Sequence, residues 1–222
     1  MENETSFDQL KGVDELKLLH QGKWANADVY RFRKAGALRV LKTFSKRTLW
    51  IRWTLGVLFT WRESSALRRM EGIDGVPADV QKNRAFSLHY RYMEGITLAT
   101  YMGKHGALPR AYFEAAEKLL AQIHERNLVH LDLRRGENWI VAPDGKPGII
   151  DFQSMISVRF LPKAIRNWLF EIDYSGVYKF WKKGCEEPLD EERKKRAEQI
   201  NRLRKFWVFQ GYAFEKRAKR KK

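Results

Sequence analysis

The stretch His130-Leu-Asp132-Leu-Arg-Arg-Gly-Glu-Asn138, followed soon after by Ile149-Ile150-Asp151-Phe152-Gln153, decides the expected fold of this chain. It brings two acids and an amide into one short segment. An acid in the first part can orient a hydroxyl group and accept its proton. The amide and the second acid can hold Mg²⁺ against nucleotide phosphates. This set of residues therefore suits phosphoryl transfer.

The residues around these polar positions predict a β-hairpin. Asn138 precedes the apolar run 139–141, a turn with proline and glycine follows at 143–146, and a second apolar run occupies 148–150. Apolar runs on both sides of such a turn are typical of two antiparallel strands. The hairpin would hold Asn138 and Asp151 close together.

Taken singly, each polar residue has an ordinary structural explanation, because Asp, Asn and His often cap turns and strand ends. Their conjunction favours a functional site. The segment resembles the protein-kinase-like superfamily, with its His-x-Asp catalytic loop and its Asp-Phe-Gly metal motif. The interval from Asp132 to Asn138 is one position longer than in protein kinases, and Gln153 replaces the glycine. Both departures look more like small bacterial kinases, including lipopolysaccharide core (Kdo/heptose) kinases and RIO-like kinases.

The resemblance implies an α+β, two-lobed protein-kinase-like fold with a reduced C-terminal lobe. Residues 1–92 would form an N-terminal lobe of a β-sheet plus one helix. Residues 93–222 would form a mainly helical C-terminal lobe with the catalytic loop and a basic tail. The resemblance also implies ATP and Mg²⁺ as cofactors, with Asp132 as base or hydroxyl orienter and Asn138 and Asp151 as metal ligands.

An upstream segment resembles the loop that covers the nucleotide phosphates in this superfamily. The run Gly22-Lys-Trp24-Ala-Asn-Ala27-Asp-Val29 keeps the first glycine of the Gly-x-Gly-x-x-Gly-x-Val pattern and replaces the other two with Trp24 and Ala27. On its own the motif is weak, because a lone glycine is more often only a turn residue. A short strand then ends at Lys42, where the resemblance places the lysine that pairs with ATP. Gly22, Val29 and Lys42 are therefore expected at the nucleotide.

A helix is expected after this strand, because apolar residues recur at helical spacing: Ala66, Leu67 and Met70. Glu63 lies one turn before Leu67 on the same side, so it can point inward and pair with Lys42. The alternative is a solvent-exposed pair with Arg62 or Arg68, which is common on helices. We favour the inward pair.

Met93 and Glu94 follow an alternating strand and are similar to the hinge between the lobes, where the backbone would bind adenine. Met93 can equally be an ordinary core residue. Pro109 then begins an amphipathic helix with one apolar stripe: Phe113, Ala116, Leu119, Leu120 and Ile123. This helix would support the catalytic loop, and Asp173 is expected to brace the same loop.

Length and composition agree with one compact unit or two small lobes, because 222 residues with 44% hydrophobic content can bury a real core. Cys185 is the single cysteine, which excludes an intrachain disulfide and favours a reducing compartment.

The acidic, polar N-terminus is unlike a secretory signal. Arg52 interrupts the most apolar run, 49–60, which is shorter than the ~20 residues of a spanning helix. A cytoplasmic location is expected, either free or peripheral on the inner face of the membrane.

The charge balance suggests an acidic partner, since 43 Lys and Arg against 27 Asp and Glu give a formal +16. The basic tail 216–222 can reach anionic lipid or nucleic acid, and the sign of the charge does not decide between them. The stretch 46–62 combines three tryptophans with flanking cations, which is typical of a segment in a membrane interface; core packing is an equal alternative. For the similar stretch 160–170 core packing is preferred. The interleaved tryptophans favour lipid slightly.

These expectations converge on an ATP-dependent phosphotransferase that moves the γ-phosphate to a hydroxyl. By resemblance, the preferred acceptor is a sugar of a lipid-linked glycan such as the lipopolysaccharide inner core. The alternative is a RIO-like serine/threonine protein kinase, although no Ala-Pro-Glu motif follows Gln153, which argues against a protein substrate. An interpretation from another class is a pseudokinase scaffold, which the thin glycine loop and Gln153 favour and the retention of five polar positions opposes.

Overall fold

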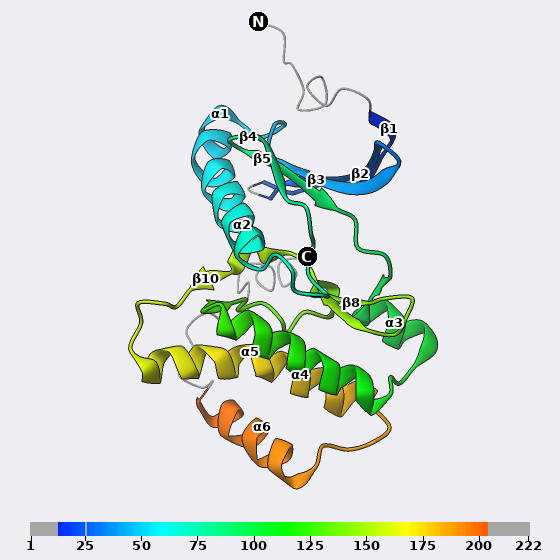
Figure 1. Ribbon diagram of the computed structural model, residues 1–222, viewed down its shortest axis with the longest axis vertical. Coiled ribbons are helices and arrows are strands. Elements are labelled where there is room, and N and C mark those ends of the chain that lie inside the picture. Colours follow the sequence, from blue (N-terminus) through cyan, green and yellow to red (C-terminus); the bar gives the residue numbers. More distant parts are fainter. Residues whose placement is uncertain (1–12, 25, 204–222) are drawn as a thin grey trace, which may run out of the picture.

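The computed structural model describes residues 13–24 and 26–203. They form an upper part built on an antiparallel sheet and a lower part built mainly of helices (Figure 1). The predicted α+β fold class is therefore confirmed. The basic tail 216–222 lies outside the described residues, and the division of the chain at residue 92 stays a prediction.

The upper part contains a five-stranded antiparallel sheet in the order β1-β2-β3-β5-β4. Its strands are β1 (Val13–His20), β2 (Asp28–Lys34), β3 (Ala37–Thr43), β4 (Gln81–Arg84) and β5 (Ser87–Arg91). Ala35 and Gly36 join β2 to β3, and both have positive φ, as the tight turns that match strand twist require. The central strand β3 is buried from 39 to 43, which places Lys42 inside the molecule.

One helical segment packs beside this sheet. It consists of α1 (Leu49–Ile51), the π-helical turn η1 (Arg52–Gly56) and α2 (Val57–Arg69). The three apolar positions that predicted a helix are buried: Ala66, Leu67 and Met70. Gly56 lets the segment approach the sheet closely, because a Cβ added there would lie 3.0 Å from the Cβ of Phe44.

The lower part consists of helices with two small sheets. The helices are α3 (Leu98–His105), α4 (Arg110–Glu125), α5 (Lys163–Gly184) and α6 (Glu191–Leu203). One sheet joins β6 (Ile96–Thr97), β8 (Trp139–Val141) and β9 (Pro147–Ile149); the other joins β7 (Leu128–Val129) to β10 (Ile156–Ser157). The 3₁₀ turns η2 (Gly136–Asn138) and η3 (Phe152–Ser154) flank β8 and β9. The predicted hairpin is confirmed, because β8 and β9 pair antiparallel.

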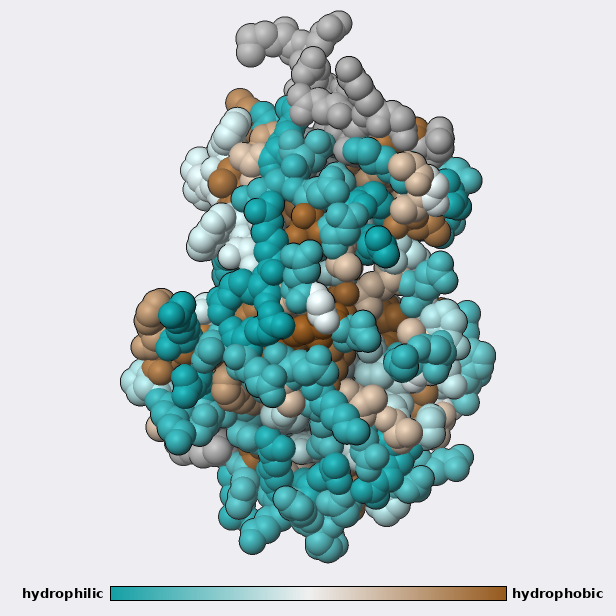
Figure 2. Space-filling model, viewed as in Figure 1, coloured by the Kyte–Doolittle hydropathy of each residue, from teal (hydrophilic) through white to brown (hydrophobic). Residues whose placement is uncertain are grey.

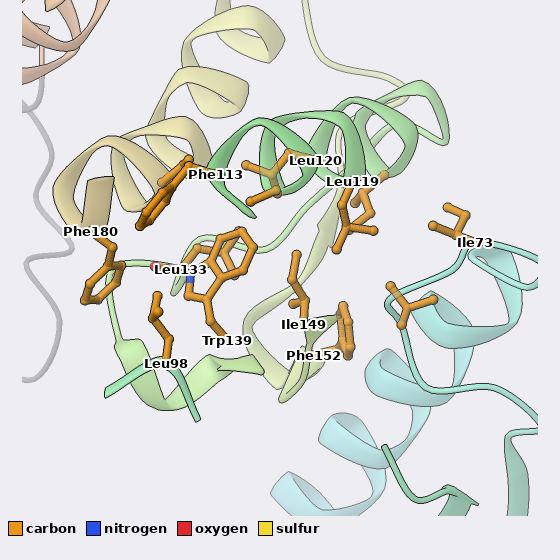
Figure 3. Packing of buried hydrophobic residues seen from close by; sticks show 14 of the residues in the cluster. Ile73, Leu98, Phe113, Leu119, Leu120, Leu133, Trp139, Ile149, Phe152 and Phe180 are labelled. Carbon is orange, nitrogen blue, oxygen red and sulfur yellow. Dashed lines mark hydrogen bonds between the residues drawn. The ribbon is translucent and has the colours of Figure 1, made fainter. Parts of the chain in front are cut away.

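A continuous hydrophobic core joins the two parts. Its members include Val40 and Leu67 from the upper part and Leu120 from α4. All five predicted apolar positions of α4 are buried, and Figure 3 shows this helix facing the hairpin residues Trp139 and Ile149. Trp139 Nε1 donates a hydrogen bond to the carbonyl oxygen of Leu133 at 2.8 Å, so the loop 130–138, the predicted catalytic loop, is fixed to the core.

The aromatic stretch 46–62 is not packed in the core as a whole. Its tryptophans are exposed: Trp50, Trp53 and Trp61. Ile51 and Gly56 are buried, because they lie on the side of the helical segment that faces the sheet. None of the helices within the described ranges is both long and apolar enough to cross a membrane.

For the stretch 160–170 the preference for core packing is wrong at its first half. The exposed residues are Phe160, Leu161 and Ile165. They belong to the loop before α5 and to the first turn of that helix, where the chain lies at the edge of the core. Leu169 is buried, and Trp168 and Phe170 pack against the same cluster, so core packing is correct further along the helix.

Candidate active site

Lys42 is the centre of a buried ion-pair cluster. Its Nζ lies 2.7 Å from Oε1 of Glu63 on α2 and 2.8 Å from Oδ1 of Asp151, which follows β9. Lys42 and Glu63 are almost fully buried, whereas the Asp151 side chain is partly exposed. The inward pair of Lys42 with Glu63 is therefore confirmed, and the structure adds the bond to Asp151.

Burial and neighbouring charge oppose each other in this cluster. Burial alone lowers the pKa of Lys42, but the carboxylates of Asp151 and Glu63 outweigh it and hold that pKa well above its usual value. The Lys42 ammonium likewise lowers the pKa of Asp151, while burial raises the pKa of Glu63. With Lys42 protonated and both acids ionised, the cluster carries one excess negative charge, which favours the approach of a cation.

The catalytic loop brings Asp132 and Asn138 into contact. Asn138 Nδ2 donates to Oδ2 of Asp132 at 3.0 Å and to its carbonyl oxygen at 3.0 Å. Because the amide nitrogen is used in this way, the oxygen Oδ1 is the end of Asn138 available to a cation. Ile150 N donates to the Asn138 carbonyl at 3.0 Å, so the residue before Asp151 lies beside Asn138, as the hairpin predicted.

The Asp132 carboxyl is more basic than an ordinary aspartate. Burial raises its pKa, and the positive charge of Arg135 and the hydrogen bond from Asn138 only partly oppose this effect. A raised pKa suits a group that accepts a proton from an incoming hydroxyl.

Asp173 on α5 holds the start of the catalytic loop. Its Oδ2 accepts a hydrogen bond from His130 N at 2.8 Å, and its Oδ1 accepts one from Leu131 N at 2.8 Å. His124 Nε2 lies 3.1 Å from the same Oδ2. Leu131 has a positive φ of 67°, a strained conformation for a leucine, so the two backbone bonds stabilise an unfavourable turn. The expected bracing contact is present.

Asp151 also has a left-handed backbone, with φ 66° and ψ 68°. Asp151 lies two residues after the end of β9, and its carboxylate contacts Lys42. Two contacts fix the segment that follows: Ser154 Oγ donates to His130 O at 2.7 Å, and Arg62 Nη2 donates to Met155 O at 3.0 Å. The metal-motif segment is therefore tied both to the catalytic loop and to α2.

The proposed phosphate-covering loop is held by its glycine. Gly22 N donates to Oδ1 of Asp28 at 2.9 Å, and a Cβ at Gly22 would lie 2.3 Å from the carbonyl oxygen of Asn26. Val29 is partly buried against the main core, and Trp24 is exposed with a positive φ of 46°. The close backbone contacts explain why a glycine stands at position 22. Nucleotide contact by Gly22 and Val29 stays a prediction.

At the expected hinge, residues 92–95 join β5 to β6 without regular secondary structure. Met93 is partly buried, and its Cε lies where a Cβ on Gly148 would be only 2.4 Å away, so Met93 packs over β9. Glu94 is exposed. The core interpretation of the Met93 side chain is therefore supported, and backbone contact with adenine stays a prediction.

Two arginines near the site were not assigned a functional role from the sequence. Arg62, considered only as a surface partner for Glu63, anchors α2 through its bonds to the Met155 and Ser154 carbonyls. The charge of Arg135 partly opposes the burial that raises the pKa of Asp132, and it adds to the effect of Lys42 that lowers the pKa of Asp151, so it acts on both acids. The Arg-Arg pair in the catalytic loop was the available signal for Arg135.

Asp151 and Asn138, the two predicted metal ligands, offer a carboxylate and an amide oxygen to a magnesium ion that would keep water and phosphate ligands. Within the described ranges, no group of three or more His, Cys, Asp or Glu side chains could hold a metal. Mg²⁺ commonly binds through one or two carboxylates together with substrate phosphates. Asp151 and the Asn138 oxygen match that smaller ligand set.

Comparison with solved structures shows which known fold this chain resembles. The Rio2 kinase from Chaetomium thermophilum matches with a TM-score of 0.58 and 16% identity over 88% of this chain and 65% of that one. The Rio2 kinase–ADP/Mg²⁺–phosphoaspartate complex from the same organism matches with a TM-score of 0.56 and 15% identity, over 90% of this chain and 67% of that one. No protein-family model matches the sequence, and no curated protein matches it.

This likeness concerns the fold, because identity is low and this chain spans 65% of the length of the first Rio2 kinase structure. The expected resemblance to RIO-like kinases is thereby supported at the level of structure, whereas the resemblance to lipopolysaccharide core kinases is not shown. The chain shares the protein-kinase-like fold of Rio2 kinase over most of its length.

Proposed function

We propose that this protein is an ATP-dependent phosphotransferase that moves the γ-phosphate to a hydroxyl group. The observation that carries the proposal is Lys42, held by Glu63 and Asp151 within 2.8 Å on a fold shared with a kinase. The ADP and Mg²⁺ of the Rio2 complex support nucleotide binding by this fold.

The proposed mechanism assigns one task to each polar residue. Glu63 positions Lys42, and Lys42 binds the phosphates of the nucleotide. Asp132 orients the acceptor hydroxyl and takes its proton, helped by the raised pKa of its carboxyl. Asn138 and Asp151 would hold Mg²⁺, which supplies positive charge to the phosphate oxygens when bound.

Two acceptor classes remain in the proposal. The likeness to Rio2 kinase supports a RIO-like protein kinase better than a kinase of lipid-linked glycans. The exposed tryptophans of the 46–62 stretch are the observation that keeps a lipid-linked sugar as the second candidate.

The experiment is transfer of ³²P from γ-labelled ATP into fractionated protein, glycan and lipid pools, with Asp132→Asn as the matched control. Label in the protein pool supports the RIO-like candidate, and label in the glycan or lipid pool supports the other. Label retained on the protein itself is tested with hydroxylamine, which cleaves acyl phosphates such as the phosphoaspartate of the Rio2 complex.

A pseudokinase scaffold is the competing class. It has no need for the Lys42 cluster, yet the lysine, both acids and the amide keep their contacts. If no pool is labelled above the Asp132→Asn control while ATP still raises the melting temperature, the enzyme proposal is wrong and the scaffold is the better account.

A further inference from the structure

The helical segment α1–η1–α2 exposes large apolar side chains. Leu49, Trp50 and Trp53 are 66%, 69% and 59% exposed, and Trp61 is exposed further along the segment. Trp53 packs edge-on against Phe86 of the upper part, so its position is set by the fold. Several exposed tryptophans on one short segment are unusual for a surface that meets only water, where exposed apolar residues are normally scattered singly.

The lower part adds a second exposed apolar group. Phe160 is 91% exposed, and Leu161 and Ile165 are exposed beside it in the chain. These residues follow β10, which α2 contacts, and Arg62 bonds α2 to the segment just before β10. In Figure 1, α1, α2 and the loop between β10 and α5 lie toward the same side of the molecule, and Figure 2 shows hydrophobic residues on that edge of the lower part.

Charge is one-sided in both segments. Residues 46–62 contain four Lys and Arg and no Asp or Glu, and residues 154–170 contain three Lys and Arg and no Asp or Glu. All 27 Asp and Glu residues of the chain lie outside these two segments. Among these cations Lys46, Arg159 and Lys163 are exposed, and Arg159 lies over the Phe160 ring. Exposed cations near exposed aromatic rings match a negatively charged surface into which the rings can be buried.

We propose that these two segments, 46–62 and 154–170, form one docking surface for an anionic lipid bilayer. Indole rings favour the headgroup level, because they combine an apolar body with a polar N–H group. The cations add attraction to anionic headgroups. The described helices include none that could span a membrane, so the contact would be peripheral. The inference does not depend on phosphotransfer, because docking is measured without ATP.

Docking would also involve the active site. α2 carries Trp61 on its exposed side and Glu63 on its buried side, where it holds Lys42. Arg62 between them bonds to the segment that follows Asp151. A bilayer bound to this surface would therefore contact the helix that positions the ion-pair cluster, and it would hold the site at the membrane surface.

The test is sedimentation of the full chain with vesicles of phosphatidylglycerol and phosphatidylcholine in equal parts, against phosphatidylcholine alone. We compare Leu49→Ser/Trp50→Ser and Phe160→Ser/Ile165→Ser with the control Leu16→Ser/Leu18→Ser. The control residues are exposed on β1, an edge strand that lies away from α1 and α2 in Figure 1. Each docking variant should bind anionic vesicles at least about tenfold more weakly than the wild type, and the control should bind normally. Added salt should weaken wild-type binding, because it screens the cations.

Three outcomes would overturn the proposal: no wild-type sedimentation with anionic vesicles at low salt, equal binding to neutral vesicles, or equal losses in the docking variants and the control. Circular dichroism checks that each variant is folded. Brominated lipids supply a measurement that needs no variant, since tryptophans buried in the bilayer are quenched by them. Unquenched wild-type fluorescence on bound vesicles would also contradict the proposal.

Discussion

Lys42 meets two carboxylates that reach it from different parts of the chain. Glu63 comes from α2 and Asp151 from the segment after β9. A buried lysine paired with a single carboxylate would give a cluster with no net charge. This cluster has two carboxylates, so it carries one excess negative charge when all three groups are ionised. That excess negative charge, together with the partial exposure of Asp151, is the basis for proposing that Asp151 holds a metal ion while it stays paired with Lys42.

Asp132→Asn should abolish most turnover and keep the fold. The amide can still bond to Asn138, but it no longer accepts a proton from the acceptor hydroxyl. A positioned general acid or base typically raises the reaction rate ~10²–10⁴-fold. The value of kcat should therefore fall by that order, while ATP affinity changes little. Steady-state kinetics and nucleotide titration measure both quantities, and near-normal kcat would remove Asp132 from its assigned role.

Asp151→Ala should abolish the tightening of ATP binding by Mg²⁺. The variant loses the ionised carboxylate whose pKa Lys42 depresses, and with it one of the two proposed metal ligands. Isothermal titration with and without Mg²⁺ measures the effect, with the exposed Asp144→Asn as a control outside the site. The same dependence on Mg²⁺ in wild type and Asp151→Ala would contradict the metal assignment.

At the scale of elements, α5 and the catalytic loop act as one unit through Asp173. Asp173→Asn should destabilise the fold by about 2–4 kcal/mol, because a buried acceptor of two backbone N–H groups is replaced by an amide that can satisfy fewer of them. Thermal unfolding measures the loss. Asp144→Asn, in an exposed turn, should leave the melting temperature nearly unchanged, and equal melting temperatures for the two variants would refute the bracing role.

The β3–β5 pair predicts a pH dependence of stability. Arg39 Nε donates to His89 Nδ1 at 2.9 Å, and burial together with the charge of Arg39 lowers the pKa of His89 from 6.5 to about 4. Because the folded-state pKa lies below the unfolded one, the unfolded chain binds more protons between these values. The contribution of neutral His89 to stability is therefore fully present above pH 6.5. It is lost as the pH falls toward 4, which lowers the free energy of unfolding by roughly 1–3 kcal/mol.

His89→Gln tests this contribution, since glutamine can still accept from Arg39 and does not titrate. Denaturant unfolding at pH 6.5 and pH 4 should show a smaller loss of stability in the variant than in the wild type. Other groups titrate equally in both proteins, so the difference isolates His89. Parallel losses in the two proteins would show that His89 is not the source.

At the scale of the whole molecule, the two parts are joined by more than the chain. The core cluster runs through both, and the bond between Lys42 and Asp151 links the upper sheet to the hairpin of the lower part. Calorimetry should therefore record one cooperative unfolding transition. ATP with Mg²⁺ at about 100 times its dissociation constant should add roughly 2.7 kcal/mol of stability to that transition. Two separate transitions would contradict the shared core.

Features that depend on local sequence pattern could be predicted before the structure was known. The apolar stripe of α4, the hairpin 139–149 and the helix that carries Glu63 follow from periodicity and turn residues, and each is present. The spacing of polar residues also indicated the candidate site, because the resemblance to the protein-kinase-like superfamily rests on short motifs. The catalytic and nucleotide-binding roles of these residues stay predictions until activity is measured.

Tertiary packing sets which distant groups meet and which apolar residues stay exposed. The bond between Lys42 and Asp151 joins residues 109 positions apart, and no local pattern encodes such a pair. Phe160 and Trp50 have the same composition signal as buried aromatics, yet both are exposed. Burial depends on which elements pack against a segment, so apolar character alone does not distinguish a core face from a docking surface.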